Sequence, residues 1–381
     1  MAAFDEVQGK LGFGLMRLPK VEDASGERID LGQVERMVDA FLDAGLTYFD
    51  TAYVYHDGQS ECVARKALVE RHPREAFTLA TKLPAWKLEK PEDMQRIFDE
   101  QLERTGAGFF DYYLLHNVAD EHIGVYERMG AWEWAQRLRD KGLIRHLGFS
   151  FHDTADVLDR LLTEHPEVEF VQLQINYLDW GHDVVQSGAC YEVAERHGVP
   201  VVVMEPVKGG TLAKLPEDVA APLTALDASA SQASWALRFA ASLSQVKMVL
   251  SGMSTEAQMA DNLATLAPSA FKPLTQEERD ALHEVVSRYT SVETVGCTAC
   301  RYCTPGCPQG IDIPAIISCV NNRRRYRDGR SEMAYQRALT AGSARASACV
   351  ACGQCESACP QHLPIIEVLK EAAEAFDTKE E

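Results

Sequence analysis

The chain has 381 residues, of which 46% are hydrophobic and 25% are charged, and this composition is that of an ordinary globular protein. The length leaves room for one large domain and one smaller domain. A formal net charge of −19 argues against a nucleic acid or an anionic membrane as partner, because either would need a basic surface.

The sequence shows no targeting or membrane-spanning segment. No stretch approaches the roughly 20 apolar residues of a membrane-spanning helix. The start, MAAFDEVQGK, has no basic residues followed by an apolar run, so we expect a cytoplasmic protein. Eleven cysteines in such a protein indicate bound metal rather than disulfides. Nine of them follow residue 290, so we expect one domain at 1–285 and a second at 286–381.

Eight short apolar runs are predicted strands. They are Leu11–Met16, Thr47–Ala52, Phe77–Lys82, Asp111–His116, Arg145–Ser150, Phe170–Tyr177, Val199–Glu205 and Lys247–Gly252. Most are continuously apolar, which is typical of parallel strands covered on both faces. Helical patterns lie between them, and this alternation predicts an α/β fold, a (β/α)8 TIM barrel. An open doubly wound sheet is the alternative, but no Gly-x-Gly-x-x-Gly opens a helix after an early strand.

Amphipathic patterns predict helices between and after the strands. The predicted helices are Leu31–Ala44, Lys90–Arg104, Trp132–Asp140, Val184–His197, Ala230–Leu243, Glu256–Leu266, Pro273–Tyr289, Pro314–Arg325, Glu332–Ala341 and Ile365–Phe376. In the segment Pro273–Tyr289, Thr275 is the predicted N-cap and Glu278 follows three residues later.

Polar residues stand at the ends of three successive predicted strands. They are Asp50, Lys82 and His116, with Tyr55 just beyond the first strand. In a barrel of this kind the C-terminal strand ends meet at one face and carry the chemistry. Any one of the four alone is more often structural, such as an aspartate that caps a helix. Together the four residues favour an active site.

The chemistry of these four residues is coherent. A tyrosine has a pKa of about 10, and a neighbouring lysine ammonium is expected to lower it so that the phenol exchanges a proton near neutral pH. Asp50 would hold Lys82 in place, and His116 would orient a substrate oxygen. The set suits protonation of a carbonyl oxygen while a hydride reaches the carbon.

Four segments follow one another along the chain, and they read FDTAYVY, ATK, YYLLH and GFS. In this order they resemble the aldo-keto reductase family, over roughly residues 8–270. The family motif Asp-Thr-Ala-x-x-Tyr matches Asp50 and Tyr55, and its lysine and histidine match Lys82 and His116. The resemblance implies a nicotinamide coenzyme, NADH or NADPH, bound without a Rossmann fold, and Tyr55 as general acid.

The resemblance also assigns coenzyme contacts. Ser150 and Gln174 fall where the family holds the nicotinamide carboxamide, with Gln172 two residues earlier on the same face of the strand. Phe151 stands where an asparagine is common, and Met204 where an aromatic ring is common. The segment SGMSTEAQMADN resembles the loop and helix for the adenosine half, and its assigned residues are Gly252, Ser254, Gln258 and Asn262.

The same segment bears on the choice of coenzyme. It has no lysine or arginine between Met248 and Phe271, and it contains Glu256. Because a 2′-phosphate needs a basic partner, we expect NADH to serve at least as well as NADPH. The substrate is less specified: Tyr53, Trp86 and Trp180 follow strand ends and either wall an apolar pocket or only cover the barrel mouth.

Eight cysteines near the C-terminus form two equal motifs. The motifs are Cys297-x2-Cys300-x2-Cys303-x3-Cys307-Pro308 and Cys349-x2-Cys352-x2-Cys355-x3-Cys359-Pro360. Each is a bacterial [4Fe–4S] ferredoxin motif, in which the fourth cysteine binds the other cluster. One cluster is therefore assigned to Cys297, Cys300, Cys303 and Cys359, and the other to Cys349, Cys352, Cys355 and Cys307. A zinc ribbon would leave four cysteines and both prolines without a role.

The remaining cysteines, Cys62, Cys190 and Cys319, are expected to be buried apolar residues. About forty residues separate the two motifs, and their helical patterns resemble the ferredoxin-like modules of larger enzymes. A subset of aldo-keto reductases carries such a C-terminal module. GFGLMRLP and QINYLDW fit that subset as well.

Three functions remain open from sequence. The first is an NAD(P)H-dependent reductase of a small carbonyl or quinone-like substrate, with clusters that are structural or sense redox state. The second is an enzyme whose clusters feed single electrons from a ferredoxin or flavoprotein to the substrate. The third is an electron-carrier subunit. A nicotinamide gives two electrons as hydride and a cluster passes one, and we see no clear flavin motif between them. We favour the first.

Overall fold

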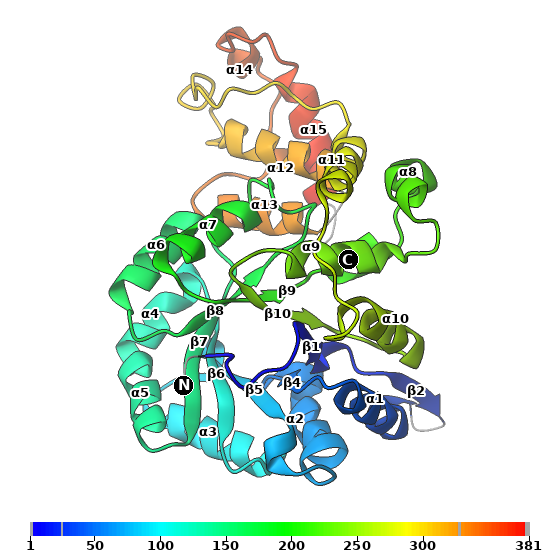
Figure 1. Ribbon diagram of the computed structural model, residues 1–381. Coiled ribbons are helices and arrows are strands. Elements are labelled where there is room, and N and C mark those ends of the chain that lie inside the picture. The colour runs from blue at the N-terminus through cyan, green and yellow to red at the C-terminus, as the bar shows by residue number, and fades with distance from the viewer. Residues whose placement is uncertain (1–2, 24–25, 327–328, 378–381) are drawn as a thin grey trace. The chain divides into compact units, whose positions relative to one another are not determined.

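The structure, a computed structural model, describes residues 3–23, 26–326 and 329–377. It divides into two compact units, Met1–His283 and Glu284–Glu381. Figure 1 shows that the first unit is a ring of strands surrounded by helices and that the second is mostly helical. Among the described residues, no helix has the length and hydropathy needed to cross a bilayer.

Eight parallel strands form a closed barrel in the first unit. They are β1 (Leu11–Gly14), β4 (Tyr48–Asp50), β5 (Thr78–Pro84), β6 (Phe110–Val118), β7 (Ile144–Phe151), β8 (Phe170–Gln174), β9 (Val201–Met204) and β10 (Val246–Ser251). Consecutive barrel strands are hydrogen-bonded neighbours, and β1 closes the ring by pairing with both β4 and β10. The predicted (β/α)8 barrel is confirmed, and each predicted strand overlaps one of these.

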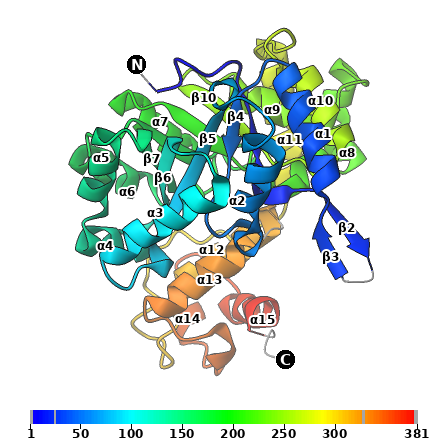
Figure 2. The same cartoon turned by 90° about the horizontal axis from the view of Figure 1, so that it is seen from below.

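Helices surround the strands, as Figures 1 and 2 show. They are α1 (Leu31–Asp43), α2 (Gln59–Ala64), α3 (Glu92–Thr105), α4 (Asp120–Met129), α5 (Ala131–Asp140), α6 (Ala155–Glu164), α7 (Ser187–His197), α8 (Glu217–Leu226), α9 (Gln232–Ala241) and α10 (Glu256–Leu266). The next helix, α11 (Gln276–Thr290), crosses the boundary between the two units. The predicted capping box at the start of α11 is confirmed, because the Thr275 amide donates to Glu278 (2.8 Å) and the Glu278 amide to Thr275 Oγ1 (3.3 Å).

Several elements were not predicted. They are the helices α2, α4, α6 and α8 and an antiparallel hairpin of β2 (Lys20–Asp23) and β3 (Gly26–Ile29). The hairpin is polar and largely exposed, so its sequence lacks the apolar alternation that marks a half-buried strand. Short helical turns also occur at Leu15–Arg17, Tyr55–Gly58, Arg65–Val69, Arg74–Ala76, Ala85–Lys87, Lys208–Ala213 and Ala346–Ala348.

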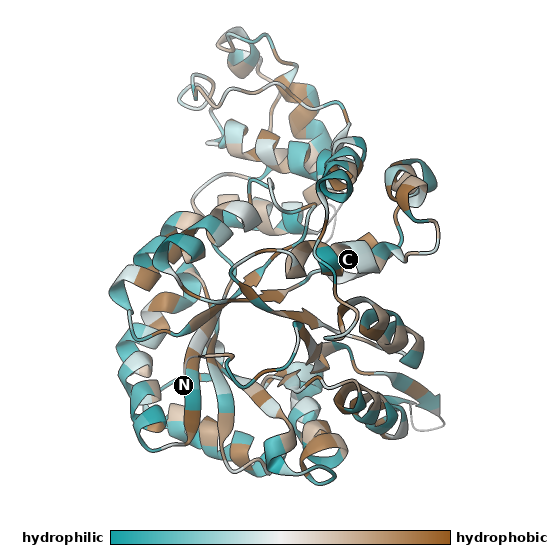
Figure 3. Cartoon of the chain, viewed as in Figure 1, coloured by the Kyte–Doolittle hydropathy of each residue, from teal (hydrophilic) through white to brown (hydrophobic). Residues whose placement is uncertain are grey.

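The lumen of the barrel is packed with side chains rather than open. Tyr48, Tyr112 and Phe170 are fully buried there, and Phe4 stacks on Tyr112 with ring centroids 4.8 Å apart. Figure 3 shows the hydrophobic colour concentrated on the strands and the polar colour on the outer faces of the helices. In a barrel with a packed interior, a site forms at the C-terminal ends of the strands.

The second unit has a small hydrophobic core of its own. Its helices are α12 (Ile313–Tyr326), α13 (Arg330–Thr340), α14 (Gln354–Ser357) and α15 (Ile365–Phe376). They bury Ile316, Tyr335 and Leu369 together with Cys319. Cys319 and Cys190 are buried as expected, but Cys62 is exposed, because it lies on the outward face of α2.

Candidate active site

The four predicted catalytic residues meet at one end of the barrel. Asp50 ends β4, Lys82 and His116 lie near the ends of β5 and β6, and Tyr55 begins the turn Tyr55–Gly58. The Lys82 ammonium donates to Asp50 Oδ1 at 2.6 Å, to the Thr51 carbonyl at 2.8 Å and to the Tyr55 hydroxyl at 3.2 Å. Lys82 is fully buried, so its charge depends on these partners.

The charge state of the lysine follows from this environment. Burial alone would lower the pKa of Lys82, but the charge of Asp50 and the hydrogen bonds to Asp50 and Tyr55 outweigh burial and raise it. Lys82 is therefore an ammonium ion at neutral pH. It points one of its protons at the phenol oxygen of Tyr55.

The tyrosine differs from the sequence-based expectation. Burial raises the pKa of Tyr55 above its usual value, and the charge of Lys82 offsets only part of that effect. The predicted fall in the pKa of Tyr55 is therefore wrong for this structure, because loss of solvent is the larger effect. The phenol keeps its proton at neutral pH, which is the form that a proton donor requires.

His116 is held as a neutral imidazole. Burial lowers its pKa far below the usual value, and the nearby charge of Lys82 lowers it further. Its ring lies edge-on to the Tyr55 ring, with centroids 5.9 Å apart, and within the described residues its Nδ1 has no hydrogen-bond partner. The Tyr126 hydroxyl lies 2.7 Å from the His116 carbonyl oxygen and fixes the backbone there. His116 also lines the cleft next to Tyr55, so its imidazole lies beside the phenol there.

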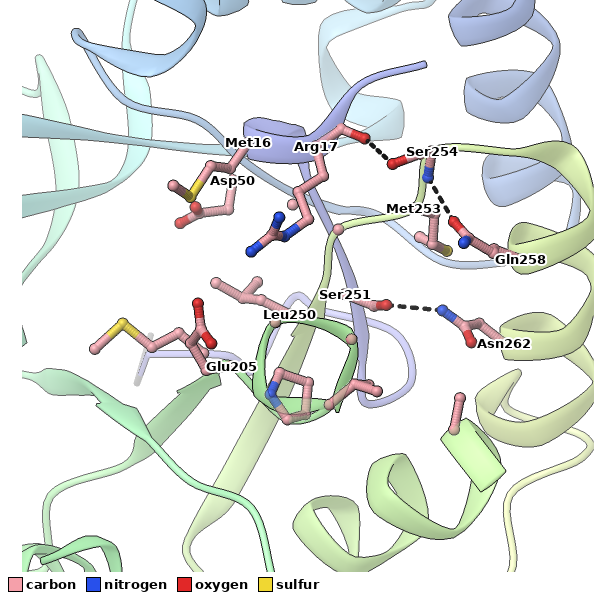
Figure 4. A pocket seen from close by; sticks show the side chains of 18 of the residues that line it. Met16, Arg17, Asp50, Glu205, Leu250, Ser251, Met253, Ser254, Gln258 and Asn262 are labelled. Atoms are coloured by element: carbon pink, nitrogen blue, oxygen red, sulfur yellow. Dashed lines mark hydrogen bonds between the residues drawn. The ribbon is translucent and has the colours of Figure 1, made fainter. Parts of the chain in front are cut away.

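A cleft of about 480 Å³ opens beside these residues, which is within the range of small-molecule sites. Asp50, Tyr55 and His116 line one part of it. The predicted coenzyme residues that line it are Ser150, Gly252, Ser254, Gln258 and Asn262. Figure 4 shows the cleft with Ser254, Gln258 and Asn262 along one wall.

The wall on the α10 side is a connected polar network. The Thr255 side chain caps α10 by accepting from the Gln258 amide (3.1 Å), and Gln258 Oε1 accepts from the Ser254 amide (2.7 Å). Asn262 Nδ2 donates to Ser251 Oγ (2.8 Å). The first amides of a helix attract anions, so this wall suits the phosphates of a dinucleotide.

The two glutamines of β8, Gln172 and Gln174, differ in whether they line the cleft. Gln174 does not line the cleft; its amide nitrogen donates to Asp179 Oδ2 at 2.8 Å, beside the buried Asp179–Lys208 ion pair. Gln172 lines the cleft instead, with its amide nitrogen 3.4 Å from Asp50 Oδ2. The structure therefore places Gln172, and not the predicted Gln174, in the lining of the cleft, because the carboxylate of Asp179 holds the side chain of Gln174.

Arg17 is a cleft residue that the sequence analysis missed. It ends the turn after β1, its carbonyl accepts from Ser254 Oγ (2.8 Å), and Figure 4 shows its guanidinium pointing into the cleft. A Cβ on Gly252 would lie 3.1 Å from Arg17 Cβ and Cγ, so the glycine makes room for the arginine side chain. Arg17 lies in GFGLMR, more than 200 residues before the segment from Met248 to Phe271, which itself has no basic residue.

Of the three aromatic candidates, one stands near the catalytic residues. Trp86 is 45% exposed, and its ring centroid lies 5.1 Å from that of His116. Tyr53 donates to Glu100 (2.6 Å), and Trp180 packs on Tyr191. None of the three lines the cleft.

In the second unit the eight motif cysteines surround two cavities. One is lined by Cys297, Cys300, Cys303 and Cys359, and the other by Cys307, Cys349, Cys352 and Cys355. In each, the fourth cysteine comes from the other motif, as the spacing predicts. Within the described residues no three His, Cys, Asp or Glu side chains converge on one ion. A four-iron cluster holds its thiolates further apart than one ion does, so the donor sets fit such clusters.

The fold and the site define a parallel (β/α)8-barrel protein with a polar cleft at one end and a cysteine-rich helical domain. Residues 10–287 match the aldo/keto reductase family, and residues 296–364 match a 4Fe-4S dicluster domain. The chain therefore belongs to the aldo/keto reductase family and carries a C-terminal 4Fe-4S dicluster domain, which confirms the predicted resemblance.

Two aldo-keto reductases are similar to about half of the chain. The chain is 28% identical over 211 residues to "Probable aldo-keto reductase 1" of Glycine max, which is 53% of this chain and 56% of the relative. It is 29% identical over 218 residues to aldo-keto reductase str7 of Strobilurus tenacellus, which is 55% of this chain and 62% of the relative. The matches thus span less than two thirds of either relative.

Solved structures share the fold. An aldo-keto reductase from Bacillus halodurans in its holo form matches with a TM-score of 0.57 and 24% identity, over 73% of this chain and 96% of that one. An aldo-keto reductase from Klebsiella pneumoniae in complex with NADPH matches with a TM-score of 0.56 and 22% identity, over 73% and 90%. At these identities the likeness establishes the barrel fold.

Proposed function

We propose that the protein is an NAD(P)H-dependent oxidoreductase that reduces an aldehyde or ketone, with Tyr55 as the general acid. The observation that carries this proposal is the hydrogen bond from the buried Lys82 ammonium to the Tyr55 hydroxyl, 3.2 Å long, at the mouth of the cleft. Family membership and the NADPH bound to the Klebsiella pneumoniae relative support the coenzyme class.

Each residue of the site has one role in the proposed reduction. NADH or NADPH supplies a hydride to the carbonyl carbon when it is bound in the cleft. Tyr55 gives its proton to the carbonyl oxygen, and the product is the alcohol. Lys82 stabilises the phenolate left on Tyr55, and Asp50 keeps the lysine charged and in place. The neutral imidazole of His116 orients the carbonyl oxygen beside the phenol.

The coenzyme would lie along the α10 wall. We assign the carboxamide to Ser150 and Gln172, the adenosine half to Gly252, Ser254, Gln258 and Asn262, and the pyrophosphate to Arg17. The Ser150 hydroxyl accepts from the Asn117 amide at 2.8 Å, which fixes its oxygen and aims its proton elsewhere.

NADH should serve at least as well as NADPH. Glu256, the first residue of α10, carries a negative charge at this end of the helix and pairs with Arg36 at 2.6 Å, so the Arg36 guanidinium is already bound to a carboxylate. A strong preference for NADPH in the ratio of kcat/KM values would contradict this assignment.

The domain at 286–381 would hold two [4Fe–4S] clusters, each through three cysteines of one motif and the fourth cysteine of the other. In this proposal the clusters transfer electrons, sense the redox state or stabilise the fold of the domain. The two cysteine-lined cavities also favour a second candidate function, in which an external ferredoxin or flavoprotein reduces the clusters and single electrons reach the substrate. An electron-carrier subunit is the third candidate, and the complete catalytic set in the barrel weighs against it.

Two experiments test the proposal. Carbonyl and quinone substrates are screened with both coenzymes, and Tyr55→Phe is compared with wild type. We expect Tyr55→Phe to lose carbonyl reduction by about 10²- to 10⁴-fold while it keeps its iron content. Turnover close to wild type in Tyr55→Phe would contradict the role of the tyrosine.

The second experiment mixes the anaerobic protein with NADH or NADPH and follows the visible absorbance of the clusters. We expect steady carbonyl reduction without bleaching. Bleaching would show that electrons pass between the coenzyme and the clusters and would favour the second function.

A further inference from the structure

The cysteine domain is built from two halves that repeat at a constant offset of 52 residues. Cys349 corresponds to Cys297, and α15 begins at Ile365 where α12 begins at Ile313. The left-handed backbone positions repeat as well. They are Ala299 (φ 54°) and Ala351 (φ 52°), Arg301 (φ 63°) and Gly353 (φ 77°), and Gly310 (φ 69°) and His362 (φ 51°).

The cysteine motifs differ at several corresponding positions, and two of these concern residues that line the first cavity. Thr298 and Arg301 line the first cavity, which is that of Cys297, Cys300, Cys303 and Cys359. Their counterparts in the other half are Val350, which lines the second cavity, and Gly353. The residue after each Cys-Pro pair is the same, Gln309 or Gln361. The lining of the first cavity therefore includes an arginine and a threonine, whereas the other half has a glycine and a valine at those positions.

Arg301 occupies a backbone position that suits glycine better. A left-handed φ is unfavourable for a residue with a Cβ and costs glycine nothing, and the other half does use glycine there. The arginine is held by Asp312, whose Oδ2 accepts from Arg301 Nη1 at 3.1 Å. A residue in this conformation beside a binding site is a candidate for a functional side chain.

Charge next to a cluster sets its reduction potential. Reduction adds one negative charge to the cluster, so a neighbouring cation favours the reduced state and a neighbouring carboxylate opposes it. Arg301 should raise the potential of the first cluster, and Asp312 should offset part of that effect. The Arg301 side chain is 62% exposed, so the effect should weaken as salt concentration rises.

We propose that Arg301, assisted by Thr298, makes the cluster of Cys297, Cys300, Cys303 and Cys359 the higher-potential cluster of the pair. The proposal rests on the assignment of two [4Fe–4S] clusters made above. A single electron supplied to the domain then moves from the cluster of Cys307, Cys349, Cys352 and Cys355 to the first cluster. That transfer oxidises the donor cluster, reduces the acceptor cluster and involves no proton.

The test is a redox titration of the intact protein with dithionite, followed by electron paramagnetic resonance, with iron and sulfide measured on every sample. Arg301→Gly makes the first half match the second and removes backbone strain, so it should fold. We expect it to lower only the higher of two midpoint potentials. A tenfold change in the electron distribution between the clusters would be a shift of about 59 mV.

Asp312→Asn is the matched control for a structural effect, because asparagine also caps a helix. We expect it to raise the same potential that Arg301→Gly lowers, and both shifts should shrink at high salt. Unchanged potentials in Arg301→Gly, or shifts of the same sign in both variants, would overturn the proposal. Wild-type protein without iron and sulfide for two clusters would instead overturn the cluster assignment itself.

Discussion

The two regions of this protein specify their sites in opposite ways. In the barrel, Asp50, Lys82 and His116 come from three neighbouring strands, and the pairing of these strands brings them together with Tyr55 beside the cleft. In the cysteine domain, most ligands of each cavity are adjacent in sequence, and the fold adds one residue from the other motif. The geometry of the barrel site is therefore held by buried charges. The geometry of each cysteine site is held by the group that the cysteines bind.

The largest effect is expected at the buried ion pair. Lys82→Met leaves the Asp50 carboxylate buried without its cation, which costs about 3–5 kcal/mol of folding stability. Carbonyl reduction should also fall by at least about 100-fold, because the Tyr55 phenolate loses its stabilising charge. Urea unfolding and kcat measure the two effects.

A double variant separates these two effects. Asp50→Leu with Lys82→Met removes both charges and should recover most of the stability but none of the activity. A double variant as unstable as Lys82→Met would show that the loss comes from packing and not from an unpaired charge.

The cysteine domain should respond to the loss of one distant ligand. Cys359→Ala removes the ligand that the second motif gives to the first cavity, so the cluster of Cys297, Cys300 and Cys303 should be lost or altered. Carbonyl reduction in the barrel should change less than about threefold, since the barrel residues are untouched. Iron content and the resonance spectrum report the cluster, and Cys319→Ala, which changes a buried cysteine outside both cavities, is the control.

A smaller effect is expected for the coenzyme cation. Arg17→Gln should raise KM for NADH and NADPH by about tenfold or more, which is the loss of one charged hydrogen bond, and leave kcat nearly unchanged. The exposed Arg36, paired with Glu256, is the matched control, and Arg36→Gln should change KM for NADH little. Equal effects of both substitutions would argue against a specific role of Arg17.

The smallest effect is the dependence of stability on pH. The pKa of His116 is far lower in the folded protein than its ordinary value of about 6.5. The unfolded chain therefore binds a proton at this residue first, and stability falls as the pH drops below about 6.5. His116→Gln should flatten the slope of unfolding free energy against pH between neutral and mildly acidic solution. If His116→Gln leaves the slope of unfolding free energy against pH unchanged, the pKa of His116 is not lowered by burial in the folded protein.

The sequence predicted the features that follow from hydrophobic periodicity and residue spacing. Apolar runs located all eight barrel strands, and their polar ends located Asp50, Tyr55, Lys82 and His116. It failed where side-chain packing decides. The pKa of Tyr55 rises because desolvation exceeds the effect of one lysine, Gln174 turns to Asp179, and Cys62 faces out of α2. Arg17 was not predicted, because it lies far in sequence from Gly252 and Ser254, beside which it lines the cleft.

The most direct test of the central claim follows the hydrogen that reaches the carbonyl carbon. NADH or NADPH deuterated at the transferred position is reacted with a carbonyl substrate under anaerobic conditions, and the alcohol is examined by mass spectrometry and NMR. Hydride transfer beside Tyr55 predicts deuterium on the carbinol carbon, in both wild type and Cys359→Ala. Product that carries only solvent hydrogen at that carbon would contradict the account and indicate single electrons delivered from the clusters.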